Sequence, residues 1–132
     1  MPVNAELAFR IRLSGDRLHA AQRLHQDKTA GSIEETGIGG AIRQAKGLLD
    51  HFHTGECNRM VPGKGRMPWR EIAEALRDID YRETVVMEPF VRMGGKVGSD
   101  IKVWRDISNG ASSEKLDEDA AESVKFERYM FE

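Results

Sequence analysis

The chain has 132 residues, a mass of 14.9 kDa and a formal net charge of −2. Its composition, 39% hydrophobic and 32% charged, is that of a globular protein of one ordinary domain. The near-neutral charge argues against a nucleic-acid-binding protein, which normally carries a basic surface. No stretch approaches the roughly 20 apolar residues that span a bilayer, and Met1–Arg10 lacks the basic-then-apolar order of a signal peptide. We therefore expect a cytoplasmic protein with no membrane and no nucleic-acid partner.

Residues 1–30 differ in character from the remainder of the chain. Apolar side chains alternate from Leu7 to Leu13, which predicts a short strand. Ser14–Asp16 predicts a turn, and a short helix is expected from Arg17 to Gln26. We therefore treat residues 1–30 as a leader of strand, turn and helix, and residues 31–132 as the main structural unit.

From residue 31 onward, helices and strands are expected to alternate. Apolar residues at the spacing of one helical face predict a helix from Ile38 to Leu49. Asp50–Thr54 has the length of a short buried strand, and the glycines and proline of Gly55–Met67 predict a loop. Pro68 suits the first position of a helix, where its missing N–H costs nothing. The apolar stripe of that helix runs from Trp69 to Ile79.

The second half of this unit continues the alternation. Thr84–Glu88 is a continuous β-branched run bounded by Pro89, which is typical of a central parallel strand buried on both faces. Two more helices are predicted over Ser99–Ile107 and Asp117–Phe131. Four large side chains at helical spacings are expected in the core, namely Trp104, Tyr129, Met130 and Phe131. This order of elements predicts an α/β fold with a parallel sheet.

Functional residues of parallel α/β sheets usually lie at the carboxyl ends of the strands, and two residues of this chain are expected there. His53 ends the first strand and Glu88 ends the second, 35 residues later, so both side chains are expected at the same rim. Structural interpretations stay open for both: a hydrogen-bonded histidine and a salt-bridged glutamate. His51 and His53 are expected to point to opposite faces of the strand, which leaves only one of them for the rim.

The single cysteine, Cys57, excludes an internal disulfide and any cysteine-rich zinc cluster. His53 and Cys57 form at most half of a zinc site, and a free thiol is the expected state. Pro62–Arg66 places glycine amides beside two cations, which suits a phosphate group, but it lacks the P-loop spacing and a solvated loop is the alternative. The acidic run Glu114–Asp119 is expected to be the solvated start of a helix.

Four ordered segments carry a family resemblance, namely His51–Arg59, Pro62–Arg66, Val85–Phe90 and Met93–Asp106. At these separations they resemble the C-terminal part of ketose 3-epimerases of the D-psicose (allulose) and D-tagatose 3-epimerase family. The resemblance runs from about Ile33 to Glu132. It implies the C-terminal part of a xylose-isomerase-like (β/α)8 TIM barrel, with parallel strands alternating with helices. The barrel would be incomplete, because a closed one typically needs ~250 residues.

The resemblance also implies a site. His53 matches a metal ligand, Glu88 matches a residue that is both a metal ligand and one of two catalytic glutamates, and Arg59 matches a substrate-binding arginine. The implied cofactor is a divalent metal, manganese foremost, with cobalt or magnesium as alternatives, and the implied substrate is a ketose such as D-psicose, D-fructose or D-tagatose. Imidazole and carboxylate suit such a metal, which would act as a Lewis acid. Epimerisation at carbon 3 needs one general acid–base group on each face of the sugar.

The N-terminal part departs from the family pattern. Counted back from Gly39, Asp27 falls in the register of the family's aspartate ligand and is an additional metal-ligand candidate. Ala30 stands where the family has a substrate-binding histidine. The family's other metal-binding and catalytic glutamate belongs upstream of the matched segment, and residues 1–30 do not match the family.

Two functions follow from the resemblance. One is a metal-dependent ketose 3-epimerase that interconverts D-fructose and D-psicose through an enediolate. The other is a catalytically inactive, truncated fragment of such an epimerase, because two strands cannot close a barrel and one carboxylate cannot serve both faces of the sugar. Self-association into a homo-oligomer would cover the apolar helix faces without supplying the second glutamate. A phosphate-binding module built on Gly63–Arg66 is a third alternative.

Overall fold

The computed structural model describes residues 9–12 and 37–132 of the chain. The elements follow in the order β1 (Phe9–Arg12), α2 (Ile38–Gln44), β2 (His51–Thr54), α3 (Trp69–Asp78), β3 (Thr84–Met87), α4 (Gly95–Asp100) and α5 (Ser113–Phe131). The predicted alternation of helix and strand from residue 38 onward is confirmed. The turn and helix expected between residues 14 and 26 lie outside the described residues. No helix of the described part is both long enough and apolar enough to cross a bilayer.

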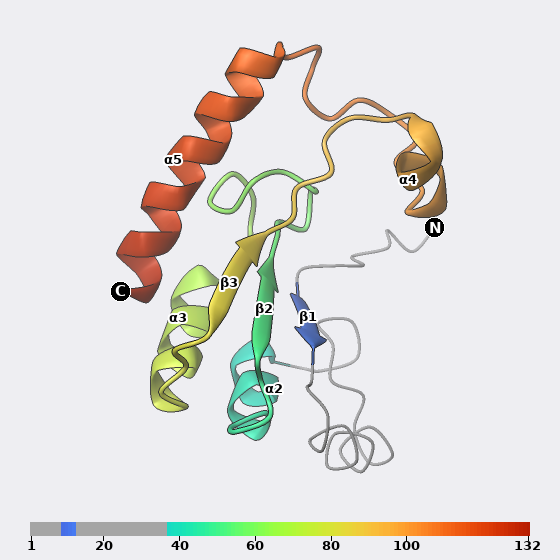
Figure 1. Ribbon diagram of the computed structural model, residues 1–132. Coiled ribbons are helices and arrows are strands. Elements are labelled where there is room, and N and C mark those ends of the chain that lie inside the picture. The colour runs from blue at the N-terminus through green and yellow to red at the C-terminus, as the bar shows by residue number, and fades with distance from the viewer. Residues whose placement is uncertain (1–8, 13–36) are drawn as a thin grey trace.

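The described strands form one sheet with β2 in the middle (Figure 1). β2 and β3 are parallel, in a register that runs from His51 opposite Thr84 to Thr54 opposite Met87. The expected parallel pairing is thus confirmed for this pair. β1 pairs with the other edge of β2 in the antiparallel direction, which departs from the all-parallel arrangement expected. The departure is confined to the strand contributed by residues 1–30, which the family resemblance does not cover.

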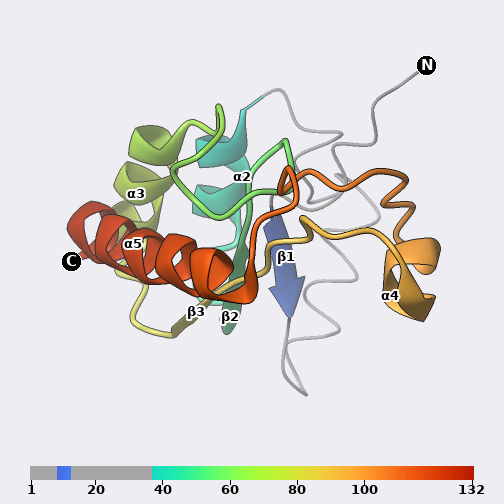
Figure 2. The same ribbon diagram turned by 90° about the horizontal axis from the view of Figure 1, so that it is seen from above.

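The two faces of the sheet differ in what covers them. Figure 2 shows α2, α3 and α5 gathered on one side of β2 and β3, which we call the helix-covered face. Phe52 and Thr54 turn to this face, and each is 1% exposed. α5 packs beside α3 on the same side (Figures 1 and 2). Side chains that alternate with Phe52 and Thr54 lie on what we call the open face, formed by His51, His53, Thr84 and Val86.

The hydrophobic core lies between the helix-covered face and the helices. Its members come from α2, α3, β2 and the turns that follow the two helices: Ile42, Ala45, Leu49, Phe52, Trp69, Ile72, Ala75, Leu76 and Ile79. The apolar stripe predicted from Trp69 to Ile79 therefore faces the core. α3 begins one residue later than expected, because Pro68 is its N-cap.

The prediction that the Thr84–Glu88 strand is buried on both faces is wrong. Exposure alternates along β3, and Val86 is 37% exposed. The cause is the position of β3 at the edge of the described sheet, where only Val85 and Met87 turn toward the helices. The β-branched run predicts that this segment is a strand, but it does not indicate which elements lie beside that strand.

The helix predicted over Ser99–Ile107 is also wrong in its bounds. α4 is formed by Gly95–Asp100 and stands apart from the other helices (Figures 1 and 2). It stops in a Schellman motif: Lys102 adopts a left-handed φ of 58° and donates its N–H to the carbonyl of Ser99, and Val103 donates to that of Gly98. This motif satisfies the last carbonyls and turns the chain out of the helix.

α5 begins at Ser113, four residues before the expected start. Ser112 is the N-cap, and its hydroxyl accepts the N–H of Lys115 at 3.2 Å. The acidic run thus lies in the first turns of the helix, as expected. The expectation that Trp104 and Tyr129 are core residues is wrong, since they are 75% and 86% exposed. Met130 and Phe131 do pack against the core.

The loop between β2 and α3 is organised around a buried carboxylate. Glu56 is 4% exposed and accepts the N–H of Gly63 at 2.8 Å, that of Met67 at 3.1 Å and the indole N–H of Trp69 at 2.6 Å. Three donors offset the cost of removing this carboxylate from water. Gly65 lies so close that a Cβ there would be 2.2 Å from Glu56 Oε2.

The same loop is tied to α5 by ion pairs. Lys64 Nζ donates to Asp119 Oδ1 at 2.7 Å and to Glu122 Oε2 at 3.0 Å. The bond with Asp119 raises the pKa of Lys64 and lowers the pKa of Asp119. The Gly63 N–H and the Lys64 ammonium, two of the donors that would hold a phosphate, thus already serve carboxylates of the chain itself. This arrangement argues against the phosphate-binding alternative.

Phe52→Ala tests the core under the sheet. Loss of this side chain from the helix-covered face should lower the free energy of unfolding by about 3–5 kcal/mol, measured by urea denaturation followed by circular dichroism. Tyr129→Ala is the control, because an 86% exposed aromatic side chain should contribute within about 0.5 kcal/mol. Equal losses in both variants would contradict the assignment of the two faces.

Gly65→Ala tests the Glu56 loop. The added methyl group must displace the Glu56 carboxylate from its three donors, which should lower the free energy of unfolding by about 1–3 kcal/mol. Gly40→Ala is the matched control, since nothing lies within 4 Å of a Cβ there and alanine should stabilise α2 by about 0.5–1 kcal/mol. A Gly65→Ala chain as stable as the parent would mean that Glu56 is not held as described.

Candidate functional site

His53 and Glu88 are brought together at the carboxyl ends of β2 and β3. His53 lies opposite Val86 in the parallel register, and Glu88 follows two residues later on the same face. His53 Nδ1 and Glu88 Oε2 are 3.0 Å apart. The side chains are 25% and 27% exposed, so both are accessible from the open face. The structure thus brings the two residues together at the rim where the sequence analysis expected them.

The backbone continues the ladder beyond the end of β3. Glu88 donates its N–H to the carbonyl oxygen of Thr54 at 2.8 Å. Since Thr54 follows His53 directly, this bond fixes the position of Glu88 along the strand direction relative to His53. Pairing between neighbouring strands therefore brings the carboxylate to the imidazole.

His51 lies on the same face as His53, and the expectation that they point to opposite faces is wrong. Their ring centroids are 4.7 Å apart. Successive side chains of a strand alternate, so residues two apart share a face. His51 stands one pleat further from the rim, next to Thr84.

Arg59 lies in the loop after β2, in a left-handed conformation with a φ of 65°. Its carbonyl oxygen accepts the N–H of Phe90 at 2.9 Å, which joins the loop to the segment after β3. Its Nη2 donates to the carbonyl oxygen of Ile101 at 2.9 Å, whereas its Nη1 is buried without a hydrogen-bond partner. A strained backbone and an unpaired buried donor are features of functional sites.

The described residues supply two side chains suited to a divalent metal. His53 Nδ1 faces Glu88 Oε2: as Nδ1–H it donates to the carboxylate, and when unprotonated, Nδ1 and the carboxylate would both offer lone pairs to one ion. An imidazole and a carboxylate fit a manganese-type ion in kind. No group of three or more histidine, cysteine, aspartate or glutamate side chains suited to a metal occurs in the described part, so the set is incomplete there. Asp27 lies outside the described residues, and Cys57 is a free thiol.

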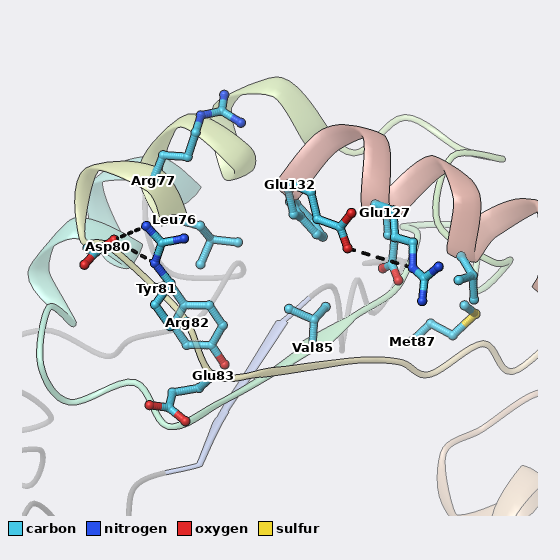
Figure 3. Close-up of a pocket in the computed structure, with 13 residues that line it drawn as sticks. Leu76, Arg77, Asp80, Tyr81, Arg82, Glu83, Val85, Met87, Glu127 and Glu132 are labelled. Atoms are coloured by element: carbon cyan, nitrogen blue, oxygen red, sulfur yellow. Dashed lines mark hydrogen bonds and ion pairs between the residues drawn. The ribbon is translucent and has the colours of Figure 1, made fainter.

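A groove of about 880 Å³ lies between α3, β3 and α5 (Figure 3). It lies on the helix-covered side of the sheet, whereas His53 and Glu88 lie on the open face. Val85 and Met87, which belong to the helix-covered face, line it. Its arginines are engaged: Arg82 pairs with Asp80 at 2.6 Å, Arg128 with Glu132 at 3.9 Å, and Arg77 donates to a backbone carbonyl at 2.9 Å. The groove is therefore not the place of the predicted chemistry.

A smaller cavity of about 370 Å³ lies closer to the rim, between the segment after β3, residues 107–111 and the start of α5. Pro89 and Phe90 line it, directly after Glu88. Sequence reasoning missed the residues that hold this region together, above all Glu56. A glutamate followed by a glycine-containing loop and a tryptophan is the signal that could have indicated such a buried acceptor, since the amides of Gly63 and Met67 and the indole of Trp69 donate to it.

Comparison with known proteins gives clear relatives. The D-psicose 3-epimerase of Ruminiclostridium cellulolyticum is 65% identical over 101 residues, which cover 76% of this chain and 34% of the relative. The D-psicose 3-epimerase of Agrobacterium fabrum is 63% identical over 99 residues, 75% of this chain and 34% of the relative. No protein-family model matches the chain.

A solved structure gives the same result. The crystal structure of D-psicose 3-epimerase with D-tagatose from Clostridium cellulolyticum H10 superposes with a TM-score of 0.73 at 66% sequence identity, over 75% of this chain and 34% of that chain. This chain spans about a third of the length of the curated relatives that it matches. The solved relatives are TIM-barrel epimerases, and the described helices and parallel strands form part of such a barrel, as expected. The chain is therefore a relative of the ketose 3-epimerases, and its matched segment corresponds to the C-terminal part of those enzymes.

Proposed function

We propose that this chain carries part of the active site of a metal-dependent ketose 3-epimerase. The observation that supports the proposal most is the 3.0 Å contact between His53 and Glu88 at the ends of two adjacent parallel strands. It occurs in a chain 65% identical to a protein named D-psicose 3-epimerase. The proposed substrate class is a ketose such as D-psicose, D-fructose or D-tagatose.

In this proposal His53 and Glu88 are metal ligands, and the ion, manganese with cobalt or magnesium as alternatives, supplies Lewis-acid stabilisation of negative charge on the sugar. Glu88 Oε atoms remove a proton from carbon 3 or return it, as a general acid–base group. Its exposed fraction of 27% leaves the carboxylate accessible to a ligand. Arg59 Nη1 donates to an oxygen of the sugar, which gives this buried donor the acceptor that it lacks.

The second candidate function is that of a non-catalytic segment that retains part of the rim. Two observations favour it: the described residues contain no group of three or more side chains suited to a metal, and the chain spans a third of its relatives' length. A carboxylate on the second face of the sugar must come from outside the described residues or from another chain. Metal binding and epimerisation are therefore tested separately.

Manganese binding is tested by thermal unfolding followed by circular dichroism. A ligand bound only by the native state at 100 times its Kd stabilises that state by about 2.7 kcal/mol, so manganese should raise the Tm of the parent chain. His53→Asn and Glu88→Gln should each remove this shift, because each removes a ligand. His51→Asn, the matched control two residues away, should keep it. A broad transition that is indifferent to manganese in the parent chain would support the second candidate.

Epimerisation is tested with D-fructose and D-psicose in the presence of manganese, with the products separated by chromatography. Glu88→Gln should abolish any interconversion that the parent chain shows, since an amide cannot take the proton from carbon 3. Glu83→Gln, at an exposed glutamate just before β3, should leave the rate unchanged. Conversion that survives in Glu88→Gln would show that Glu88 is not the general base.

A further inference from the structure

β2 carries functionally different side chains at consecutive positions. His53 lies on the open face, whereas Thr54 turns to the helix-covered face and is 1% exposed. Thr54 is linked to both members of the candidate pair: it follows His53 in the chain, and its carbonyl oxygen accepts the N–H of Glu88 at 2.8 Å. A shift of Thr54 along or across the sheet would therefore change the distance between His53 and Glu88.

Glu127 of α5 contacts this threonine on the helix-covered face of the sheet. The Thr54 hydroxyl donates to Glu127 Oε1 in a short hydrogen bond. Glu127 is 8% exposed and lies between α5 and the strands (Figure 3). Burial raises the pKa of Glu127, and the hydrogen bond from Thr54 opposes that rise. A carboxyl group at this depth is costly to bury unless it is hydrogen-bonded, and Thr54 is the partner that the structure gives it.

The hydroxyl of Thr54 also lies next to β3. It is 3.4 Å from the carbonyl oxygen of Val86, two residues before Glu88. Helix α5, strand β2 and strand β3 thus meet at one hydroxyl group. A single contact from α5 can set the position of both strand ends at the rim.

We propose that Glu127 and Thr54 are positioning residues for the His53–Glu88 pair. The hydrogen bond from Thr54 to Glu127 holds the end of β2 against α5, and the bond from the Glu88 N–H to Thr54 then sets where the Glu88 carboxylate lies relative to the imidazole. Neither Glu127 nor Thr54 touches a ligand; they act through the backbone. This inference rests on the proposed function, in which the pair holds the metal and moves the proton.

The inference matters because such a site tolerates little displacement. Productive geometry is kept within about 0.5 Å by the residues that support it, and loss of outer contacts to metal-binding side chains typically weakens metal affinity by about 10–100-fold. The contact between His53 and Glu88, which defines the site here, is therefore the quantity to measure after substitution.

The test is the tautomer ratio of His53 in the full chain, read from the imidazole ¹⁵N resonances at mildly alkaline pH. A carboxylate at Nδ1 favours the Nδ1–H tautomer. His53→Asn assigns the resonances, and Glu88→Ala gives the ratio without the carboxylate. Thr54→Val, which keeps the shape of the side chain, and Glu127→Ala should each lower the Nδ1–H fraction toward the Glu88→Ala value, with a change in the ratio of roughly fivefold, as expected for one lost hydrogen bond.

Matched variants separate positioning from mere stability. Thr54→Ser keeps the hydroxyl and should restore the parent ratio, and Glu118→Ala, at a 70% exposed side chain of the same helix, should leave the ratio unchanged. If Thr54→Val and Glu127→Ala lower the free energy of unfolding but keep the parent ratio, the inference is overturned and Glu127 only anchors α5. If Glu127→Ala does not fold, Thr54→Val decides the question alone. If Glu88→Ala has the same tautomer ratio as the parent chain, His53 and Glu88 are not hydrogen-bonded, and the observation on which the proposed function rests is wrong.

Discussion

The parallel pairing of β2 with β3 is the constraint on which the rest of the structure depends. It places Val86 opposite His53 and lets Glu88, just past the end of β3, continue the ladder onto the carbonyl of Thr54. In a strand, a slip of one residue moves every side chain to the opposite face, and such a slip would turn Glu88 away from His53. The apolar pattern resists that slip, because Phe52 and Val85 would then leave the core side of the sheet. Packing on one face thus enforces the alignment of reactive groups on the other.

The difference between the helix-covered face and the open face explains why the groove between α3, β3 and α5 is not the candidate site. Its strand residues, Val85 and Met87, are those that the alternation assigns to the helix-covered face. Burial there raises the pKa of Tyr81 to about 12, and its hydroxyl donates to the carbonyl of Thr84 at 2.8 Å, so this phenol is a packed structural group. The candidate pair lies on the open face, where the side chains of His53 and Glu88 are 25% and 27% exposed.

Much of the fold could be predicted from the sequence because it depends on local patterns. The apolar periodicity of α3, the β-branched run of β3 and the breakers after Thr54 are properties of neighbouring residues, and the rim position of His53 and Glu88 follows from them. Exposure of Val86 could not be predicted, since it depends on which strand lies beside β3. The end of α4 was missed because it depends on a left-handed Lys102, a conformation that glycine normally adopts. The partners of Glu56 and Glu127 were missed because they lie up to 73 residues away in the chain.

The segments that carry the candidate site residues are hydrogen-bonded to one another. Glu56 fixes the loop after β2, and Arg59 in that loop is tied to the segment after β3 through the N–H of Phe90 and to the end of α4 through the carbonyl of Ile101. The His53–Glu88 contact is set by the pairing of β2 with β3 and by Thr54, which is itself hydrogen-bonded to Glu127 of α5. These contacts lie between residues 53 and 127, so the groups that hold the candidate pair and Arg59 belong to the described part of the chain.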